Sequence, residues 1–118
     1  MLTIKQIAEI STAIVKIDEL KEQRAEIYNL KGEANENIAR LDAEHGTEYF
    51  EAVDEYLEYS RKERHLTNRI KSSYQKFCFA YYETLTAFGV IEKMNAGSYQ
   101  SAYETMVWEF RSQLNIFE

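Results

Sequence analysis

Apolar residues recur every three or four positions through most of this chain, which is the spacing of one face of an α-helix. The first stripe runs from Ile4 through Ile17 to Leu30 and predicts a helix over about 4–30. Thr3 and the glutamine three residues later have the spacing of a capping box, which marks the helix start.

Gly32 leaves two interpretations of the segment after it. Glycine is a common stop after the last turn of a helix, so we expect a break there and a separate short helix over 34–45. The alternative is a single helix that continues, because apolar residues keep the period at Ile38 and Leu41. A glycine inside a helix costs only about 1 kcal/mol relative to alanine.

The next helix is expected after Gly46, with Thr47 as its N-cap. Helical spacing then continues over 47–88, which indicates one helix of about 40 residues. A finer boundary at Ser60 is an alternative, since Ser60 and Glu63 have capping-box spacing.

A loop is expected from Gly89, and a last amphipathic helix over 98–116. Ser98 or Ser101 caps this helix, with Glu104 completing a capping box. Its apolar stripe comprises Tyr99, Tyr103, Met106, Phe110, Leu114 and Phe117.

These elements predict an all-α fold: a long antiparallel helical hairpin or coiled-coil-like small bundle with a C-terminal amphipathic helix. The chain has no proline, the main breaker of helix interiors, and no alternating strand pattern. Its 118 residues fit a single domain over 1–118.

Composition narrows the class of protein. Cys78 is the only cysteine, which excludes an internal disulfide and favours a reducing, cytoplasmic location. No apolar run approaches the ~20 residues that cross a bilayer, so we expect no membrane span. The net charge of −6 argues against direct nucleic-acid binding, which normally needs a basic surface.

Acidic residues gather on one side of the second long helix. At about 100° per residue, five carboxylates share an arc about 120° wide, and no lysine or arginine occurs between Asp42 and Ser60. We call this arc the acidic face. It comprises Glu48, Glu51, Asp54, Glu55 and Glu58. The arc is either a solvated surface or a docking surface for a basic partner; in a sharper version of the second interpretation, the carboxylates imitate the phosphates of a nucleic acid.

A basic stretch comes directly after the acidic face. It comprises Arg61, Lys62, Arg64, His65, Arg69, Lys71 and Lys76. If helix 47–88 paired antiparallel with a second copy of itself, the acids of one chain would lie beside the bases of the other. This arrangement predicts a symmetric homodimer.

The aromatic residues predict both core and contact surface. The run from Phe77 to Tyr82 is apolar nearly all round the helix, which predicts burial on more than one side. We expect most aromatic residues to be in the core. Trp108 lies off the stripe of its helix, so either another helix packs on it or it is an exposed binding anchor.

Catalytic and metal motifs give little support for an enzyme. Arg40-Leu-Asp-Ala-Glu-His45 resembles the arginine, four spacers and histidine of helical HEPN-type ribonucleases, although Leu41 replaces their usual polar residue. That resemblance implies RNA cleavage by Arg40 and His45. Asp42 and His45 alone do not make a metal site, and no phosphate loop or nucleophile motif occurs. We expect no catalytic residue, no metal and no cofactor.

We therefore expect a small acidic protein-interaction module that binds and inhibits a larger protein or nucleoprotein through the acidic face, with Trp108 as a further anchor. Accessory and anti-defence proteins of phages and mobile elements offer a compositional analogy. The alternatives are a self-associating coiled-coil structural protein or assembly chaperone and, third, the HEPN-like ribonuclease.

Overall fold

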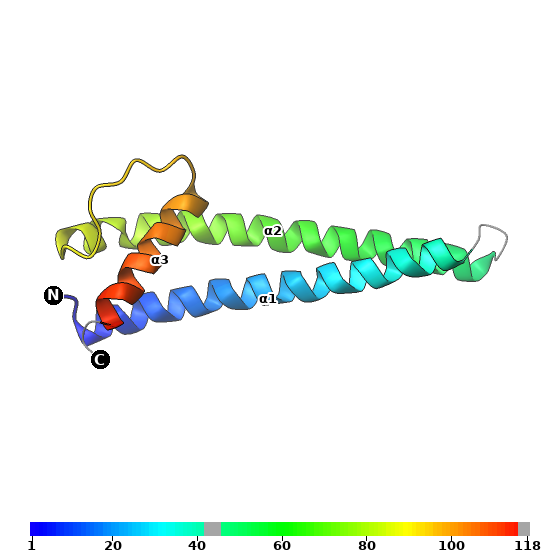
Figure 1. Ribbon diagram of the computed structural model, residues 1–118, viewed down its shortest axis with the longest axis horizontal. Coiled ribbons are helices and arrows are strands. Elements are labelled where there is room, and N and C mark those ends of the chain that lie inside the picture. Colours follow the sequence, from blue (N-terminus) through cyan, green and yellow to red (C-terminus); the bar gives the residue numbers. More distant parts are fainter. Residues whose placement is uncertain (42–45, 116–118) are drawn as a thin grey trace. The chain divides into compact units, whose positions relative to one another are not determined.

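The computed structural model describes residues 1–41 and 46–115, which form three α-helices and no strand (Figure 1). They are α1 (Ile4–Arg40), α2 (Thr47–Ala87) and α3 (Tyr99–Asn115). The predicted all-α small bundle is confirmed, while its coiled-coil-like character and the single domain stay predictions. Within the described ranges, no helix is long and apolar enough to span a membrane.

α1 begins at the predicted capping box. The Thr3 amide donates to Gln6 Oε1 at 2.8 Å, and the Gln6 amide donates to Thr3 Oγ1 at 3.1 Å. The break predicted near Gly32 is wrong, because α1 continues through it to Arg40. A single exposed glycine does not outweigh the good helix formers on both sides. The end of the predicted 34–45 helix, at 42–45, lies outside the described residues.

α2 is one uninterrupted helix of 41 residues. The predicted continuous helix is therefore confirmed, and the alternative boundary at Ser60 is wrong. α2 begins at Thr47, as predicted, but its N-cap lies one residue earlier than predicted. The Gly46 carbonyl accepts from the Phe50 amide at 3.2 Å, which makes Gly46 the N-cap and Thr47 the first helical residue. Gly46 has a φ of 58°, the left-handed region in which glycine carries no Cβ penalty.

α2 ends in a Schellman motif centred on Gly89, whose φ is 72°. The Val90 amide donates to the Leu85 carbonyl at 2.9 Å, and the Gly89 amide donates to the Thr86 carbonyl at 3.1 Å. Both Val90 and Leu85 are buried. The motif therefore satisfies the last carbonyls of the helix and turns the chain so that Val90 enters the core.

α3 is capped by Ser98, the first of the two predicted candidates. Ser98 Oγ accepts from the Ser101 amide at 3.1 Å. The box predicted between Ser101 and Glu104 does not form, because Ser101 lies inside the helix and Glu104 accepts instead from Gln100 Nε2 at 3.1 Å.

The contacts of the chain divide it into two compact units, and both long helices take part in each. Unit 1 comprises Met1–Asp18 and Ile70–Glu118, and unit 2 comprises Glu19–Arg69. Of the seventeen buried apolar residues in the described part of the chain, fourteen belong to unit 1. The main hydrophobic core therefore lies in unit 1.

The core of unit 1 is built around aromatic rings from α2 and α3. Tyr103 packs its ring 4.8 Å from that of Tyr74 and 4.9 Å from that of Phe77. Met106 and Phe110, on the same stripe of α3, are almost fully buried. Stripes from different helices thus meet as the sequence pattern predicts.

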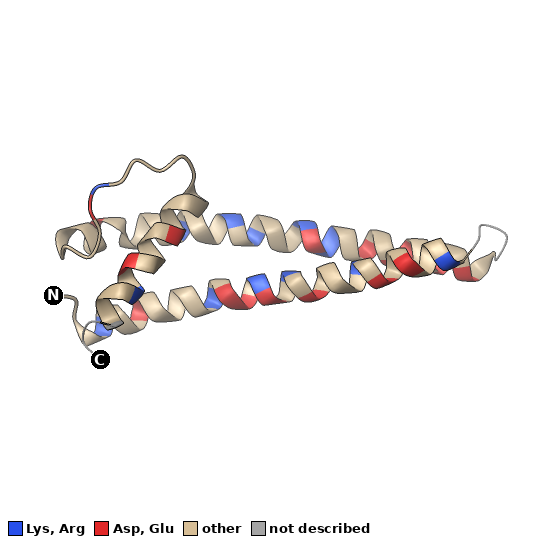
Figure 2. Ribbon diagram, viewed as in Figure 1, with Lys and Arg blue, Asp and Glu red and all other residues tan. Residues whose placement is uncertain are grey.

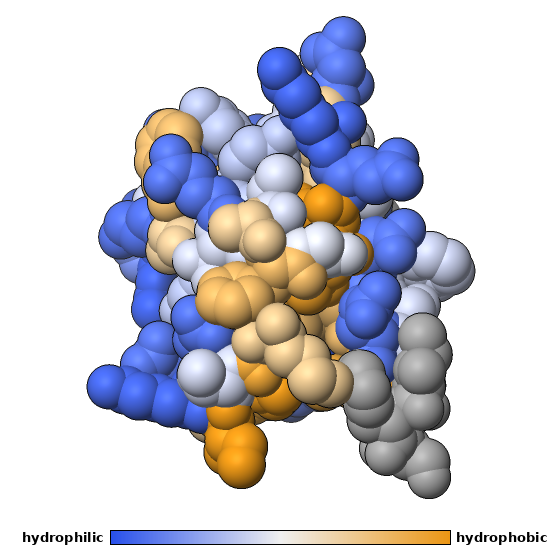
Figure 3. Space-filling model, turned by 90° about the vertical axis from the view of Figure 1, so that its left-hand side faces the viewer, coloured by the Kyte–Doolittle hydropathy of each residue, from blue (hydrophilic) through white to orange (hydrophobic). Residues whose placement is uncertain are grey.

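Unit 1 also exposes apolar side chains. Figure 3 looks onto the end of this unit that holds the N-terminus and shows apolar side chains across its middle, with hydrophilic ones around them. Ile4, the first residue of α1, is 87% exposed, and Phe88, just after α2, is 42% exposed. These two apolar residues, each at the end of a helix, therefore lie outside the core.

Unit 2 is a pair of antiparallel helix segments with a thin core. Its buried apolar residues among those described are Ala34, Ala52 and Leu66. Alanines at the contact let two helix backbones approach closely. An ion pair between Lys31 Nζ and Glu63 Oε1, at 3.3 Å and partly buried, also joins the two segments.

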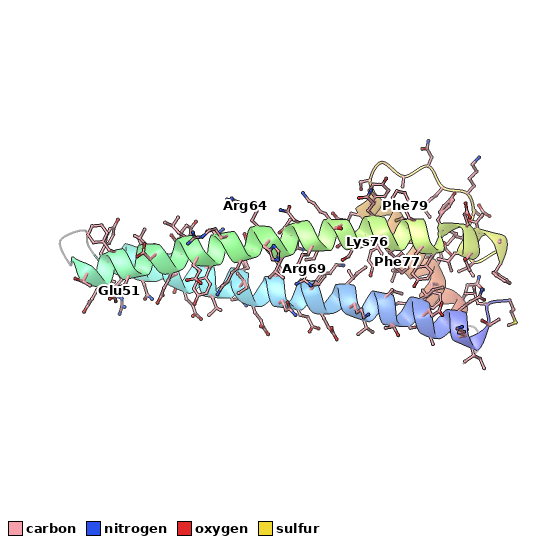
Figure 4. All side chains as sticks on the ribbon, turned by 180° about the vertical axis from the view of Figure 1, so that it is seen from behind. Glu51, Arg64, Arg69, Lys76, Phe77 and Phe79 are labelled. Carbon is pink, nitrogen blue, oxygen red and sulfur yellow. The ribbon has the colours of Figure 1, made fainter. Side chains whose placement is uncertain are left out.

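The prediction that most aromatic residues are core is wrong. Among the described aromatic residues, only Tyr74, Phe77, Tyr103 and Phe110 are buried. Phe79, two residues after Phe77, lies on the opposite side of α2 and is 70% exposed (Figure 4). Phe79 keeps an edge contact with the Tyr99 ring, 5.6 Å between ring centres, but most of its side chain lies in solvent. The apolar run at 77–82 is therefore not buried all round the helix.

Candidate functional site

The acidic face lies in unit 2, on the first three turns of α2. All five of its carboxylate residues are exposed, and Glu51 is labelled in Figure 4. The buried residues Ala52 and Leu66 direct one side of α2 toward α1, and the acidic residues fall to the flank of that side at about 100° per residue. The helix thus presents the acids to solvent as the sequence predicts.

Four of the five carboxylates have no ion-pair partner among the described residues: Glu48, Glu51, Asp54 and Glu55. Glu58 is the exception, since its Oε1 lies 3.4 Å from Lys62 Nζ, with both side chains more than half exposed. Such a pair contributes at most about 1 kcal/mol. Among the described residues, the repulsion within the acidic face is therefore offset by Lys62 at one end and otherwise by solvent and dissolved ions.

α1 adds carboxylates to the same end of unit 2, which sequence reasoning missed. Figure 2 shows acidic residues on both helices toward the 41–46 connection. Glu33 and Glu36 are exposed and line a groove of about 570 Å³ beside Gly32. The signal in the sequence is Gly32, a glycine between helix-forming residues, which the sequence pattern interprets as a helix stop or as an interior position of a continued helix, and not as part of a groove.

The basic stretch is exposed along α2, and it surrounds a buried stripe. Leu66 and Ile70, which form this stripe, are buried. Lys62 also lies 5.8 Å from the centre of the Tyr59 ring. Because Lys62 is already engaged with Glu58, it neutralises one end of the acidic face.

Trp108 is 67% exposed on α3. Of the two predicted alternatives, the exposed one is therefore correct, while its role as a binding anchor stays a prediction. Its neighbour Arg111 forms an ion pair with Asp18 at 3.4 Å. Trp108 belongs to unit 1 and the acidic face to unit 2, so they are surfaces of two different units.

Of the residues considered for catalysis, only Arg40 lies within the described ranges. Arg40 donates through Nη2 to Asn37 Oδ1 at 3.2 Å, and Asp42 and His45 lie outside the described residues. No group of three metal-ligating side chains occurs within the ranges that the structure describes. Cys78 is buried, and its Sγ donates to the Tyr99 carbonyl at 3.6 Å. Burial raises the pKa of its thiol, which disfavours the reactive thiolate.

Fold and surface together define an all-α protein of three helices with a main core in one unit and exposed carboxylates in the other. Comparison with family models, with curated proteins and with solved structures finds no match for this chain.

Proposed function

We propose that this protein is an interaction module that binds a basic surface of a larger protein or nucleoprotein through the acidic face, and that occupying this surface inhibits the partner. The observation that carries the proposal is that Glu48, Glu51, Asp54 and Glu55 are exposed on one side of α2 without an ion-pair partner among the described residues. Like charges three and four residues apart each cost about 0.2–0.5 kcal/mol in a helix. A basic partner would replace that repulsion with attraction.

The spacing of the charges supports the sharper version, in which the acidic face imitates a nucleic acid. Glu48 and Glu58 are ten residues apart, or about 15 Å along a helix. Five carboxylates over that length give about one charge per 4 Å, close to the roughly 3.4 Å between charges along one DNA strand. A cleft lined with Lys and Arg would therefore find a similar charge density on α2.

The test is affinity capture with a matched pair of charge-reversal variants. The first combines Glu51→Lys, Glu55→Lys and Glu58→Lys in the acidic face. The control reverses three exposed acids of unit 1, Glu9, Glu83 and Glu92, and changes the net charge by the same amount. Wild-type protein and both variants serve as bait in lysate of the cell that makes the protein, at low and high salt, with mass spectrometry of what is captured.

We expect one dominant partner with a basic surface, retained by the wild type and the unit 1 control and lost from the acidic-face variant and at high salt. Added to an assay of that partner's own activity, the wild type should inhibit it. Equal capture by both variants would contradict the proposal, because the position of the charges would then not matter.

Self-association is the second candidate, favoured by a different observation. Phe50 and Leu57, one heptad apart on α2, are 63% and 50% exposed. Apolar residues at this spacing are typical of helix pairing, and the basic stretch of a second copy could face the acidic face. Light scattering separates the candidates: a dimer that dissociates in the acidic-face variant but not in the control would favour self-pairing over docking.

A further inference from the structure

The groove beside Gly32 is an open concave surface of unit 2. Its lining comes from two turns of α1 and from Tyr56 on α2. Gly32 lies on the exposed side of α1, and a Cβ placed there would meet no atom within 4 Å. The missing side chain therefore leaves open space on the helix surface, and no packing contact among the described residues requires a glycine at this position. A locally unfavourable residue without a packing reason is typical of a functional position.

The charges of the groove favour a cation. Lys31 is the one basic residue in its lining, and its ammonium lies 3.3 Å from Glu63 Oε1 and 5.5 Å from the centre of the Tyr56 ring. Its charge is therefore matched within unit 2. Glu33 and Glu36 line the same groove, are exposed and have no ion pair among the described residues. The groove thus keeps two unmatched negative charges.

An aromatic ring and amide oxygens complete the lining. Tyr28 is 66% exposed at the edge of the groove, so its ring face is open to a ligand. Asn29 and Asn35 add side-chain carbonyl oxygens that accept hydrogen bonds. A ring face, carboxylates and amide oxygens around an open notch are together the surroundings that a planar guanidinium prefers.

We propose that the Gly32 groove receives an arginine side chain of the basic partner, stacked on Tyr28 and hydrogen-bonded to Glu33 and Glu36. This inference rests on the proposed function, since the acidic face would attract the basic partner and the groove would select arginine within it. Lysine fits less well, because its ammonium neither stacks flat on a ring nor forms forked hydrogen bonds with a carboxylate.

The test compares fluorescein-labelled hexa-arginine and hexa-lysine peptides by fluorescence anisotropy at one ionic strength. Three variants accompany the wild type. Gly32→Leu fills the notch, and Tyr28→Leu removes the ring. Ala25→Leu, at an exposed position of α1 outside the groove, is the matched control for an added leucine. Leucine is a good helix former, and circular dichroism checks that each variant keeps its helix content.

We expect the wild type and Ala25→Leu to bind hexa-arginine about fivefold more tightly than hexa-lysine. Gly32→Leu and Tyr28→Leu should bind both peptides equally, with hexa-lysine affinity unchanged. Equal affinity of the wild type for the two peptides, or a preference that survives in Gly32→Leu, would overturn the groove proposal and leave acidic-face docking standing. Failure of the wild type to bind either peptide would overturn both.

Discussion

At the residue scale, two glycines differ in their position relative to a helix: Gly89 follows the end of α2, whereas Gly32 lies inside α1. Gly89 has a left-handed backbone that ends α2, and Gly32 has a helical backbone inside α1. Neither would bring a Cβ within 4 Å of another atom. Alanine at either position therefore tests backbone conformation alone, without a steric clash.

We predict that Gly89→Ala lowers the free energy of unfolding by about 1–2 kcal/mol, because alanine strains the left-handed conformation of the Schellman motif. Gly32→Ala should raise it by about 1 kcal/mol, since alanine is the better helix former. Urea unfolding followed by circular dichroism measures both. If both substitutions changed the free energy of unfolding in the same direction, Gly89 would not have the left-handed conformation that ends α2.

Two buried groups of unit 1 predict a pH dependence. Burial raises the pKa of the Cys78 thiol. Burial, followed by the nearby Asp18 carboxylate and Tyr74, raises the pKa of the Tyr103 phenol against the opposing effect of Arg111. In both cases the folded state favours the neutral, protonated form.

The contribution of these two groups to the free energy of unfolding should therefore be constant below the ordinary thiol value of 9.0 and fall as the pH rises through 9.0 and then 10.0. The unfolded chain releases these protons at a lower pH than the folded chain does, so alkali favours unfolding. Urea titrations at neutral and alkaline pH measure the slope. Cys78→Ala combined with Tyr103→Phe should flatten it, and an unchanged slope in that variant would assign the effect to other groups.

At the scale of elements, α3 has a buried and an exposed side that the sequence pattern separates well. Phe110, on the stripe, is 1% exposed, whereas Trp108, two residues away, is 67% exposed. We predict that Phe110→Ala costs about 3–5 kcal/mol of stability. Trp108→Ala should cost less than about 1 kcal/mol, because the indole lies mostly in water. Comparable losses from thermal or urea unfolding would mean that α3 packs through a different side.

Most helix ends could be predicted because the signals are local. The capping box at Thr3, the cap at Ser98 and the stop at Gly89 each depend on a few neighbouring residues, and their hydrogen bonds form. The prediction at Gly32 is wrong because a stop glycine and an interior glycine look alike in sequence. After a stop glycine the chain leaves the helix, whereas after an interior glycine the following residues continue the helix and pack. Ala34, two residues after Gly32, is buried in α1 in this way.

At the scale of the whole molecule, the buried apolar residues are distributed unevenly. Unit 1 has fourteen of them and unit 2 has three, two of which are alanines. A unit with little buried apolar surface opens locally at a lower free energy than one with a full core. The acidic face and the Gly32 groove both belong to this thin unit.

We predict that backbone amides of unit 2 exchange hydrogen faster than those of unit 1 under native conditions, although both lie in continuous helices. Mass-spectrometric hydrogen exchange over peptides of α1 on either side of Asp18 gives the comparison within one helix. Binding of a basic partner should slow exchange in unit 2 selectively. Equal protection along α1 would show that the two units open together.

The sequence alone was enough to predict the all-α fold class, most helix ends and the position of the five acids of the acidic face on one side of α2. These features come from periodicity, capping and charge spacing, which act within a few turns of one helix. The tertiary structure decided which aromatic residues are buried, placed Trp108 in solvent and opened the groove at Gly32. Burial depends on what packs against a helix from elsewhere in the chain, so the pattern of one helix marked Phe77 and Phe79 alike as apolar, and only the packing of the other helices separated them.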